Sequence, residues 1–569
     1  MLIARFIPAA CLLLAALVPT SPASADEPAS APLSLDAIQF LPEPPGTGAA
    51  EQVADAAAVH AGYSAQRIEQ ARLDNELDPF LACAPVREAL RNSGSYPSGH
   101  SASGWAWALT LAELRPDSAD AILRRGREFG ESRVVCGVHW PSDVVAGRML
   151  GSATVAALHA REDFREMLQD SRAELSAFAP KSSGTGGASS ADAGGKLGAL
   201  LWDGVARGIP GISAAVATRD GVVWTGTAGV ANVQTGEAVR PDMLFGIGSI
   251  TKTFVAVVVL QLAQEKRLKL DQTAAGILGS AVARIPNAGK ATLAQLLNHT
   301  GGVPSWEDDP AWIREGRGAS LDVDRVWGRS DTLPYIEGHA PLAPAGLSYS
   351  YANTNYTLLG MVIEKVTGHD VVSEIHRRIL DPLGLKDIHL EGFEPEPRER
   401  LPHRYHWATP AFRESAGINA AFPEVKPGLI DATRSNLSVE WAAGGMVATA
   451  RDLALYAVAL RDGKLLDARS MRFMKDWFPV GEGQQVGHNV FRDTRSGIPV
   501  IGHGGDVLGF TGSFYWLESG DAVVAVVCNV GSMHSGDVPG TASSVAKDRR
   551  FIELAQQLAR ESARTGTPP

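Results

Sequence analysis

The sequence contains little cysteine, no excess of positive charge and no long apolar run beyond its N-terminal segment. Lysine and arginine together number 52 against 63 aspartates and glutamates, which gives a formal charge of −11. Because no basic cluster reverses that balance, we expect no nucleic-acid partner. Because no later run reaches membrane-spanning length, we also expect no integral membrane segment in the mature chain.

The first 25 residues have the order of a secretory signal peptide. Arg5 precedes an apolar run over 11–18, and Ala23-Ser24-Ala25 follows it. A charge, a short apolar core and a small-x-small cleavage site direct export, and this core is too short to span a bilayer. We therefore expect residues 1–25 to be removed and the mature protein to be periplasmic or secreted.

The chain has four cysteines, and removal of the signal peptide takes away Cys11. In an oxidising compartment Cys83 and Cys136 are the candidates for a disulfide. Cys528 lies in the apolar run 522–530 and is expected to be a buried strand residue.

A chain of 569 residues is too long for a single hydrophobic core, so we expect several domains. Residues 26–180 show helical periodicity and nothing that resembles a strand, which predicts an all-α first domain. Its clearest helices are expected over 103–114, 119–129 and 142–158. The stretch 181–196 is rich in glycine and serine, as is typical of a flexible linker.

Residues 197–562 have a different pattern, with strands at both ends and helices between them. The apolar runs 212–218 and 222–227 flank a turn, and the runs 512–517 and 522–530 form a second hairpin. This order predicts an α/β (α+β) domain with one antiparallel sheet, flanked by helices and carrying a helical insertion. Residues 563–569 are expected to be a disordered tail.

The first candidate for chemistry is Ser249 with Lys252, at the start of a helix predicted over 255–262. A serine that attacks a carbonyl carbon needs a base beside it and N–H donors for the oxyanion. Lys252 lies one helical turn after Ser249 on the same face, close enough to share its proton. The pattern alone arises by chance in most proteins of this size, so its meaning depends on partners elsewhere.

Two later motifs supply such partners. Tyr351 and Asn353 belong to Tyr-Ala-Asn, and His503 begins His-Gly-Gly just before the last hairpin. A phenol whose pKa is lowered by Lys252 can take the serine proton, while Asn353 holds Lys252 and a substrate amide. Gly505 and the glycine before it leave a strand edge open to substrate, where a backbone N–H completes an oxyanion hole.

With these motifs, the stretch from Leu197 to Ala559 resembles the serine beta-lactamase and penicillin-binding-protein superfamily. The similarity is to its branch of class C beta-lactamases, D-alanyl-D-alanine carboxypeptidases and esterases. Three more stretches carry it: Leu297-Asn-His-Thr-Gly-Gly-Val-Pro304, Asp381-Pro-Leu-Gly-Leu385 and Ala442-Ala-Gly-Gly-Met-Val-Ala-Thr-Ala-Arg-Asp-Leu453.

The resemblance implies a role for each motif residue. Ser249 becomes the acylated nucleophile and an oxyanion donor through its amide, Lys252 its activating amine, and Tyr351 the proton carrier. Asn353 positions Lys252 and substrate. The family's third motif often begins with a lysine that helps to bind a substrate carboxylate, but here it begins with His503. Imidazole holds a carboxylate less firmly, which favours an esterase or D-amino-acid peptidase over a beta-lactamase.

A second constellation lies in the first domain, where His100 ends Gly94-Ser-Tyr-Pro-Ser-Gly-His100 and His139 precedes Asp143 by four residues. Phosphoryl transfer through histidine needs a nucleophilic imidazole, an acid for the leaving oxygen and donors around the other phosphate oxygens. On a helix Asp143 can orient His139, and His100 is the candidate acid. The candidate phosphate-holding residues are Ser98, Gly99 and Arg133.

From about Cys83 to Glu174 the chain resembles the class A bacterial acid phosphatases of the phosphatidic-acid-phosphatase type 2 (PAP2) superfamily. That family has an earlier motif, Lys-x6-Arg-Pro, which supplies two phosphate-binding cations and is not found here. Losing two cations is expected to cost several orders of magnitude in rate. The first domain is therefore interpreted as a phosphatase-like domain truncated at its N-terminal side.

Three functions are compatible with the sequence. The leading hypothesis is an exported serine hydrolase that acts through acyl-Ser249 on an ester, a D-amino-acid peptide or a beta-lactam-like amide. The alternatives are a periplasmic acid phosphatase that uses phospho-His139, and a non-catalytic cell-wall peptide binder, which has no need of an activated nucleophile. The expected substrate is a small molecule or a peptidoglycan peptide. Neither resemblance requires a metal or another cofactor, and the oligomeric state stays open.

Overall fold

The computed structural model describes residues 97–116, 119–135, 139–178 and 188–565. The chain forms two compact units that divide between Ser183 and Gly184. The expected signal peptide and the candidate disulfide of Cys83 and Cys136 lie outside the described residues. Within them, no helix is both long and apolar enough to cross a membrane.

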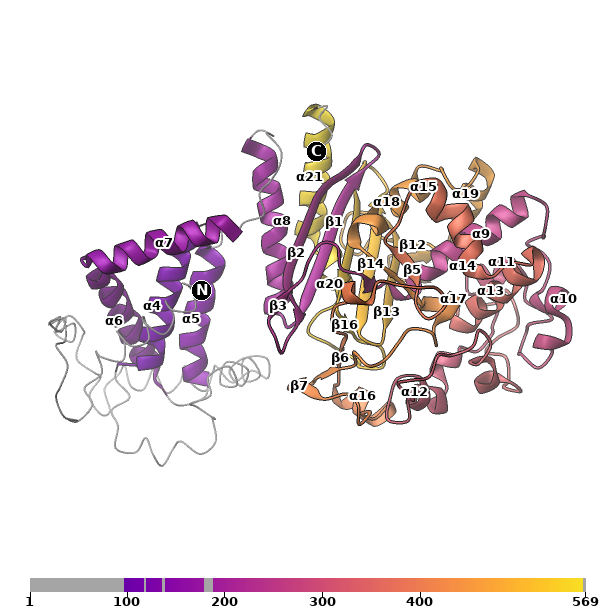
Figure 1. The fold of residues 1–569 in the computed structure, drawn as a ribbon, viewed down its shortest axis with the longest axis horizontal. Helices are drawn as coiled ribbons and strands as arrows, with labels where there is room; N and C mark the ends of the chain where they lie inside the picture. Colours follow the sequence, from indigo (N-terminus) through magenta and orange to yellow (C-terminus); the bar gives the residue numbers. More distant parts are fainter. Residues whose placement is uncertain (1–96, 117–118, 136–138, 179–187, 566–569) are drawn as a thin grey trace. The chain divides into compact units, whose positions relative to one another are not determined.

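The first unit consists of helices in its described residues, as the sequence predicted (Figure 1). Small residues bring the helices close: a Cβ on Gly151 would lie 2.5 Å from the carbonyl oxygen of Ala102. The four helices are α4 (Gly99–Leu114), α5 (Ala119–Val135), α6 (Pro141–His159) and α7 (Glu162–Phe178).

The second unit is built on a nine-stranded sheet with the order β10-β11-β12-β13-β14-β15-β1-β2-β3. The antiparallel pairing of β1 with β15 sets Ile212 opposite Cys528. Strands from the two ends of the unit therefore meet, which confirms the predicted antiparallel sheet. The strands are β1 (Gly211–Thr218), β2 (Gly221–Asn232), β3 (Glu237–Ala238), β10 (Phe478–Gly481), β11 (Gln484–Val486), β12 (Phe491–Asp493), β13 (Val500–Val507), β14 (Phe510–Leu517) and β15 (Val523–Cys528).

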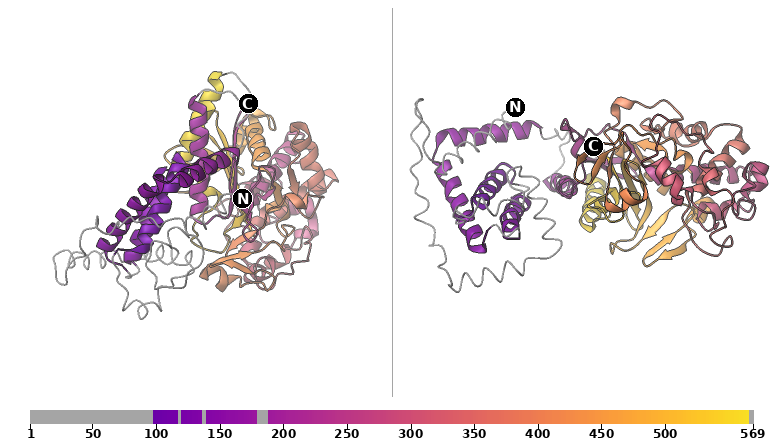
Figure 2. Two further views of the ribbon diagram at one scale, coloured as in Figure 1. Left: turned by 60° about the vertical axis from the view of Figure 1, so that its left-hand side comes forward. Right: turned by 90° about the horizontal axis from the view of Figure 1, so that it is seen from below.

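Both faces of this sheet are covered by helices (Figures 1 and 2). On β1, Ile212 and Val216 pack with α8 (Ala188–Ala206) and α21 (Arg549–Thr565). Ala215 and Ala217, which point to the opposite face, join the core of α9 (Thr251–Gln264) and α18 (Ala450–Arg461). Cys528 is fully buried on β15, as expected.

The predicted helical insertion lies between β4 and β9, and two small sheets border it. These sheets have the orders β16-β6-β8-β7 and β4-β9-β5. The helices of the insertion are α10 (Ala274–Leu278), α11 (Leu293–Leu297), α12 (Pro310–Gly316), α13 (Asn353–Thr367), α14 (Val371–Ile375), α15 (Asp381–Leu383), α16 (Pro410–Ser415) and α17 (Trp441–Gly444). Two further short helices follow β9 in the chain, α19 (Ala468–Met474) and α20 (Ala542–Ala546). The short strands are β4 (Phe245–Gly246), β5 (Ile388–Leu390), β6 (Tyr405–Trp407), β7 (Glu424–Lys426), β8 (Leu429–Asp431), β9 (Met446–Ala448) and β16 (Val530–Gly531).

Two boundaries differ from the sequence-based expectation. Helix α8 begins at Ala188, inside the stretch 181–196 that was expected to be a linker. Its later part packs Leu197 and Leu201 into the core, and a helix nucleated there extends back through residues 188–196 despite the low helix propensity of Gly194 and Gly195. Helix α21 continues to Thr565, so residues 563–565 are helical and not part of a disordered tail.

Candidate active site

Ser249 lies in the 3₁₀ turn η4 (Gly248–Ile250), which leads directly into α9. Gly248 has a φ of 53°, a conformation that favours glycine. One turn later, Lys252 Nζ donates to Ser249 Oγ at 2.8 Å and to the carbonyl oxygen of Ala443 at 2.5 Å. The structure thus brings the predicted nucleophile and amine into direct contact.

Lys252 is completely buried, and its surroundings determine its protonation. Burial lowers the pKa of its ammonium from 10.5 to about 7, while Glu307 and Glu440 oppose this shift. An amine with such a pKa is largely neutral at mildly alkaline pH and can accept a proton from the hydroxyl that it contacts.

A buried charge network that the sequence did not reveal stands behind Lys252. Arg317 bridges Glu307 and Glu440, and its Nη2 lies 2.8 Å from Glu440 Oε1. All three side chains are at least nine-tenths buried. Their positions, 307, 317 and 440, come from unrelated loops and helices, so no local pattern in the sequence signals the network.

Asn353 joins this network at the start of α13. Its Nδ2 donates to Glu307 Oε2 at 2.6 Å, and its backbone N–H donates to Ser305 Oγ at 3.0 Å. Among the described contacts of Lys252 Nζ, the acceptors are Ser249 and Ala443. Asn353 and Lys252 are therefore linked through Glu307, which accepts a hydrogen bond from Asn353 and interacts electrostatically with Lys252.

Tyr351 lies beside both members of the Ser249–Lys252 pair. Its ring centroid is 5.1 Å from Lys252 Nζ, and its side chain hydrogen-bonds to Ser249. Its ring also stacks on His299 with centroids 4.2 Å apart. The sequence-based expectation that Lys252 lowers the pKa of Tyr351 is wrong in direction: burial raises that pKa well above 10, so the phenol keeps its proton at neutral pH.

Strand β13 presents an edge to Ser249. It pairs with β14 along its whole length, whereas its recorded pairing with β12 covers only Val500–Gly502. A Cβ on Gly505 would overlap the carbonyl oxygen of Ile247 and lie 2.9 Å from the nitrogen of Ser249. A Cβ on Gly248 would lie 2.5 Å from the nitrogen of Asp506. The backbone N–H groups of Ser249 and Asp506 are thus close enough together to serve one oxyanion.

His503 faces the nucleophile as a neutral imidazole. It is 5% exposed, and its Nδ1 lies 2.5 Å from the carbonyl oxygen of Gly504. Burial lowers the pKa of His503 to about 3, and Lys252 contributes in the same direction. This histidine therefore adds no positive charge for a substrate carboxylate at neutral pH.

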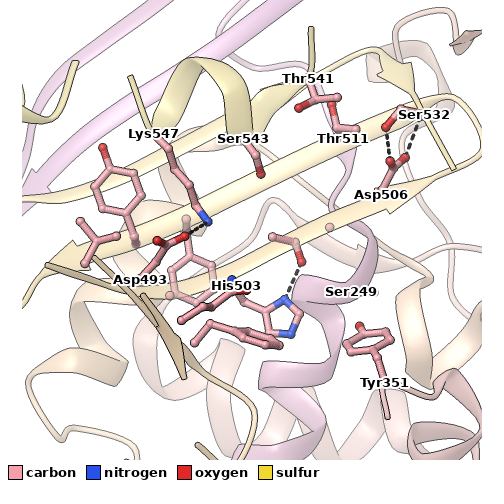
Figure 3. A pocket seen from close by; sticks show the side chains of 18 of the residues that line it. Ser249, Tyr351, Asp493, His503, Asp506, Thr511, Ser532, Thr541, Ser543 and Lys547 are labelled. Carbon is pink, nitrogen blue, oxygen red and sulfur yellow. Dashed lines mark hydrogen bonds and ion pairs between the residues drawn. The ribbon is translucent and has the colours of Figure 1, made fainter. Parts of the chain in front are cut away.

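A cavity of about 440 Å³ opens beside these groups (Figure 3). Ser249, Tyr351 and His503 line one part of it, and Lys547 and Asp493 line another. Asp506 also lines it; burial raises the pKa of that carboxyl to about 6, although Ser532 donates to it from its backbone N–H at 2.9 Å. The cavity is large enough for a short peptide or a small ester.

In the first unit the phosphatase-like motifs also converge. The backbone N–H of Ser98 donates to the carbonyl oxygen of Asp143 at 2.9 Å, which ties the start of α4 to α6. His139 Nδ1 lies 3.4 Å from Asp143 Oδ2, and the rings of His139 and His100 are 6.1 Å apart. Gly99 is the first residue of α4.

Two parts of the phosphatase-like prediction are not described. Arg133 falls in α5, but its side chain lies outside the described part of the structure. The upstream segment where the family carries its paired cations is also outside it. Within the described residues, no group of three or more His, Cys, Asp or Glu side chains is arranged to hold a metal ion.

Comparison with known proteins agrees with the motifs and geometry of the second unit. The family model for beta-lactamases matches residues 188–545, more than half of the 569-residue chain. The chain belongs to the beta-lactamase family. Its second unit has the fold of the beta-lactamase and penicillin-binding-protein serine hydrolases, which confirms the predicted fold class.

Two relatives of this unit carry hydrolase names. A D-stereospecific amidohydrolase from Streptomyces sp. is 29% identical, with a TM-score of 0.53, and the match covers 64% of this chain and 98% of that protein. The esterase EstB from Burkholderia gladioli is 29% identical over 228 residues, which are 38% of this chain and 56% of the esterase.

The first unit matches a different family. The model of the PAP2 superfamily covers residues 59–166. An acid phosphatase from Zymomonas mobilis is 56% identical over 100 residues, which are 18% of this chain and 38% of that enzyme. The chain thus spans little more than a third of the length of this phosphatase, and the predicted resemblance of the first domain to PAP2 acid phosphatases is confirmed.

The contact between Gly505 and the Ser249 turn predicts that two adjacent glycines differ in tolerance. Gly505→Ala should lower the free energy of unfolding by about 1–3 kcal/mol because its Cβ overlaps backbone. Gly504→Ala is the matched control: its Cβ would meet Ser543 Oγ at 3.4 Å, an ordinary contact, so the change should stay within about 0.5 kcal/mol. Thermal denaturation of both variants measures the difference, and equal shifts would contradict this packing.

Proposed function

We propose that the second unit is an exported serine hydrolase that forms an acyl-Ser249 intermediate. The observation that carries this proposal is the 2.8 Å contact between Ser249 Oγ and the buried amine of Lys252. A hydroxyl needs such a base to attack a carbonyl carbon. The substrate class is an ester, a D-amino-acid peptide or amide, or a beta-lactam-like amide.

The geometry supports a sequence of proton movements. As Ser249 Oγ forms a bond to the acyl carbon, its proton moves to the neutral amine of Lys252, and the carbonyl electrons move onto oxygen. The N–H groups of Ser249 and Asp506 stabilise that oxyanion. When the leaving group departs, the phenol of Tyr351, which is protonated in the resting enzyme because burial raises its pKa, gives its proton to the leaving group and recovers a proton from Lys252. Water then repeats the steps to release the acyl group.

The charges of the cavity favour one part of the substrate class. A neutral His503 offers little to the carboxylate of a beta-lactam, whereas the carboxyl of Asp506, which lines the same cavity, suits a substrate ammonium when it is ionised. This supports a substrate with a free α-amino group, such as a D-aminoacyl amide or peptide. The Streptomyces relative is a D-stereospecific amidohydrolase, which points to the same class.

Covalent labelling tests the nucleophile. A fluorophosphonate probe should label the wild-type protein, and Ser249→Ala should abolish labelling and lower ester hydrolysis by about 10³-fold or more. Ser519→Ala, in the exposed turn before β15, is the control and should label normally. Absence of labelling in the wild type would refute the proposal, and slow labelling without turnover would instead support the peptide-binder alternative.

The protonation of Lys252 predicts the pH profile. The amine accepts the serine proton only when neutral, so kcat/KM for a neutral ester should fall about tenfold per pH unit below the pKa of about 7. Activity should therefore rise with pH through this region. Asp506→Asn removes the cavity carboxyl whose pKa is about 6, and the midpoint should stay near 7 in this variant because the pair of Lys252 and Glu440 is unchanged. If the midpoint near 7 is lost in Asp506→Asn, the titrating group is Asp506 and the assignment to Lys252 is wrong.

The first unit supports a second candidate function. We propose a weak acid phosphatase activity through phospho-His139, because His100 on α4, Asp143 at the start of α6 and His139 just before α6 lie together. Asp143 can orient the imidazole for attack on phosphorus, and His100 can protonate the leaving oxygen.

Two histidine substitutions in the first unit, His139→Ala and His159→Ala, test this proposal. Wild-type protein should hydrolyse p-nitrophenyl phosphate slowly at mildly acid pH, and His139→Ala should remove this activity. His159→Ala is the control, because that histidine contacts Glu113 at 2.9 Å at the far end of α6, and its rate should stay near that of wild type. A wild-type rate equal to that of His139→Ala would exclude the phosphatase.

A further inference from the structure

His299 is a buried histidine beside the proton carrier Tyr351, and the catalytic steps above do not use it. It follows α11 in the chain, and its side chain is completely buried. It is not one of the described residues that line the cavity, whereas Tyr351 lines the cavity together with Ser249 (Figure 3). Any part that His299 takes in the reaction therefore has to act through a neighbouring side chain.

The backbone of His299 has a left-handed conformation that favours glycine. Its φ is 60°, in the turn that ends α11, where the backbone N–H of Thr300 donates to the carbonyl oxygen of Gln295 at 2.9 Å. A residue with a Cβ costs about 1–2 kcal/mol in this conformation, and helices commonly end with glycine here. Contacts made by His299 therefore have to offset this strain.

Three contacts link His299 to Tyr351 and to its two neighbours in the chain. The carbonyl oxygen of His299 accepts from the backbone N–H of Ser350 at 2.9 Å, and its Nδ1 accepts from the backbone N–H of Ala352 at 3.1 Å. The imidazole stacks on the phenol ring of Tyr351, with centroids 4.2 Å apart and 24° between the ring planes. One residue thus holds the backbone on both sides of Tyr351 and also the plane of its ring.

The hydrogen bond from Ala352 also determines the protonation of His299. Nδ1 has to keep its lone pair to accept this N–H, so the imidazole is the neutral tautomer with its proton on Nε2. Burial, and after it the charge of Lys252, lower the pKa of His299 well below 6.5. The Nδ2 group of Asn355, in the first turn of α13, lies 3.3 Å from the same nitrogen. The contacts of His299 with the Tyr351 segment therefore stay intact across the pH range in which Lys252 titrates.

Tyr351 needs such support because its phenol has to be placed accurately. It precedes α13 and is itself part of neither a helix nor a strand, so regular secondary structure does not fix its position. A catalytic group displaced by about 1 Å can cost about 100-fold in rate. We propose that His299 is a positioning residue, which holds the phenol of Tyr351 where it can give its proton to the leaving group. This inference rests on the proposed serine hydrolase function.

Two esters that differ in their leaving group separate this role from a general effect on folding. p-Nitrophenolate leaves without a proton, whereas the alkoxide of p-nitrobenzyl alcohol has to be protonated as it leaves. His299→Gly removes the imidazole and suits the φ of 60°. It should lower kcat/KM for p-nitrobenzyl acetate by about 10- to 100-fold, while kcat/KM for p-nitrophenyl acetate stays close to that of the wild type. Tyr351→Phe should show the same selective loss.

Three further variants serve as controls. In His299→Asn the side-chain oxygen can accept the N–H of Ala352, and asparagine tolerates the left-handed backbone, so this variant should recover part of the loss. His488→Asn is the matched control, since His488 is also buried and stacks on Phe473 with centroids 3.8 Å apart; the ratio of the two kcat/KM values should stay at the wild-type value. Adding His299→Gly to Tyr351→Phe should cause no further selective loss, because His299 acts through Tyr351.

Equal loss for both esters in folded His299→Gly, or an unchanged ratio in both His299 variants, would overturn the inference. Circular dichroism and fluorophosphonate labelling of Ser249 check the fold of each variant, because fluoride also leaves without a proton. If His299→Gly does not fold, a selective loss in His299→Asn supports the inference and an unchanged ratio overturns it. Failure of Ser249 labelling in the parent protein would instead overturn the catalytic proposal.

Discussion

The burial of Lys252 is the constraint on which the rest of the active site depends. An ammonium removed from water loses hydration that no neutral neighbour replaces, so burial alone favours the neutral amine. The helix start of α9 places that amine 2.8 Å from Ser249 Oγ. With a pKa of about 7, the amine of Lys252 is partly neutral at pH 7 and contacts the hydroxyl whose proton it takes.

The buried network of Glu307, Arg317 and Glu440 offsets the free-energy cost of burying the Lys252 ammonium. With Lys252 protonated, two cations face the carboxylates of Glu307 and Glu440, and the cluster is neutral. Loss of the lysine proton would leave one uncompensated negative charge in a buried place. Burial also raises the pKa of Glu440, so this carboxyl can take up a proton as Lys252 loses one. Arg317, held between both carboxylates, fixes their positions while the proton moves.

The sequence predicted what local spacing determines and missed what tertiary packing determines. Ser249 and Lys252 meet because three residues make one helical turn, and the hairpins followed from apolar runs on either side of a turn. The network of Glu307, Arg317 and Glu440 could not be predicted, because its members meet only after folding. For the same reason the predicted direction of the pKa shift of Tyr351 was wrong. The nearby amine of Lys252 suggested a lowered pKa, but burial, which no motif reveals, has the larger effect and raises it.

The neutral His503 keeps a second positive charge away from Lys252. A permanent cation at position 503 would stand close to Lys252, whose own charge already contributes to the low pKa of His503. Such a cation would suppress protonation of Lys252 during attack on the substrate, because like charges in a buried site repel strongly. The cation that lines the cavity, Lys547, instead pairs with Asp493 at 3.0 Å. A neutral His503 therefore leaves Lys252 free to take up the serine proton without a second positive charge beside it.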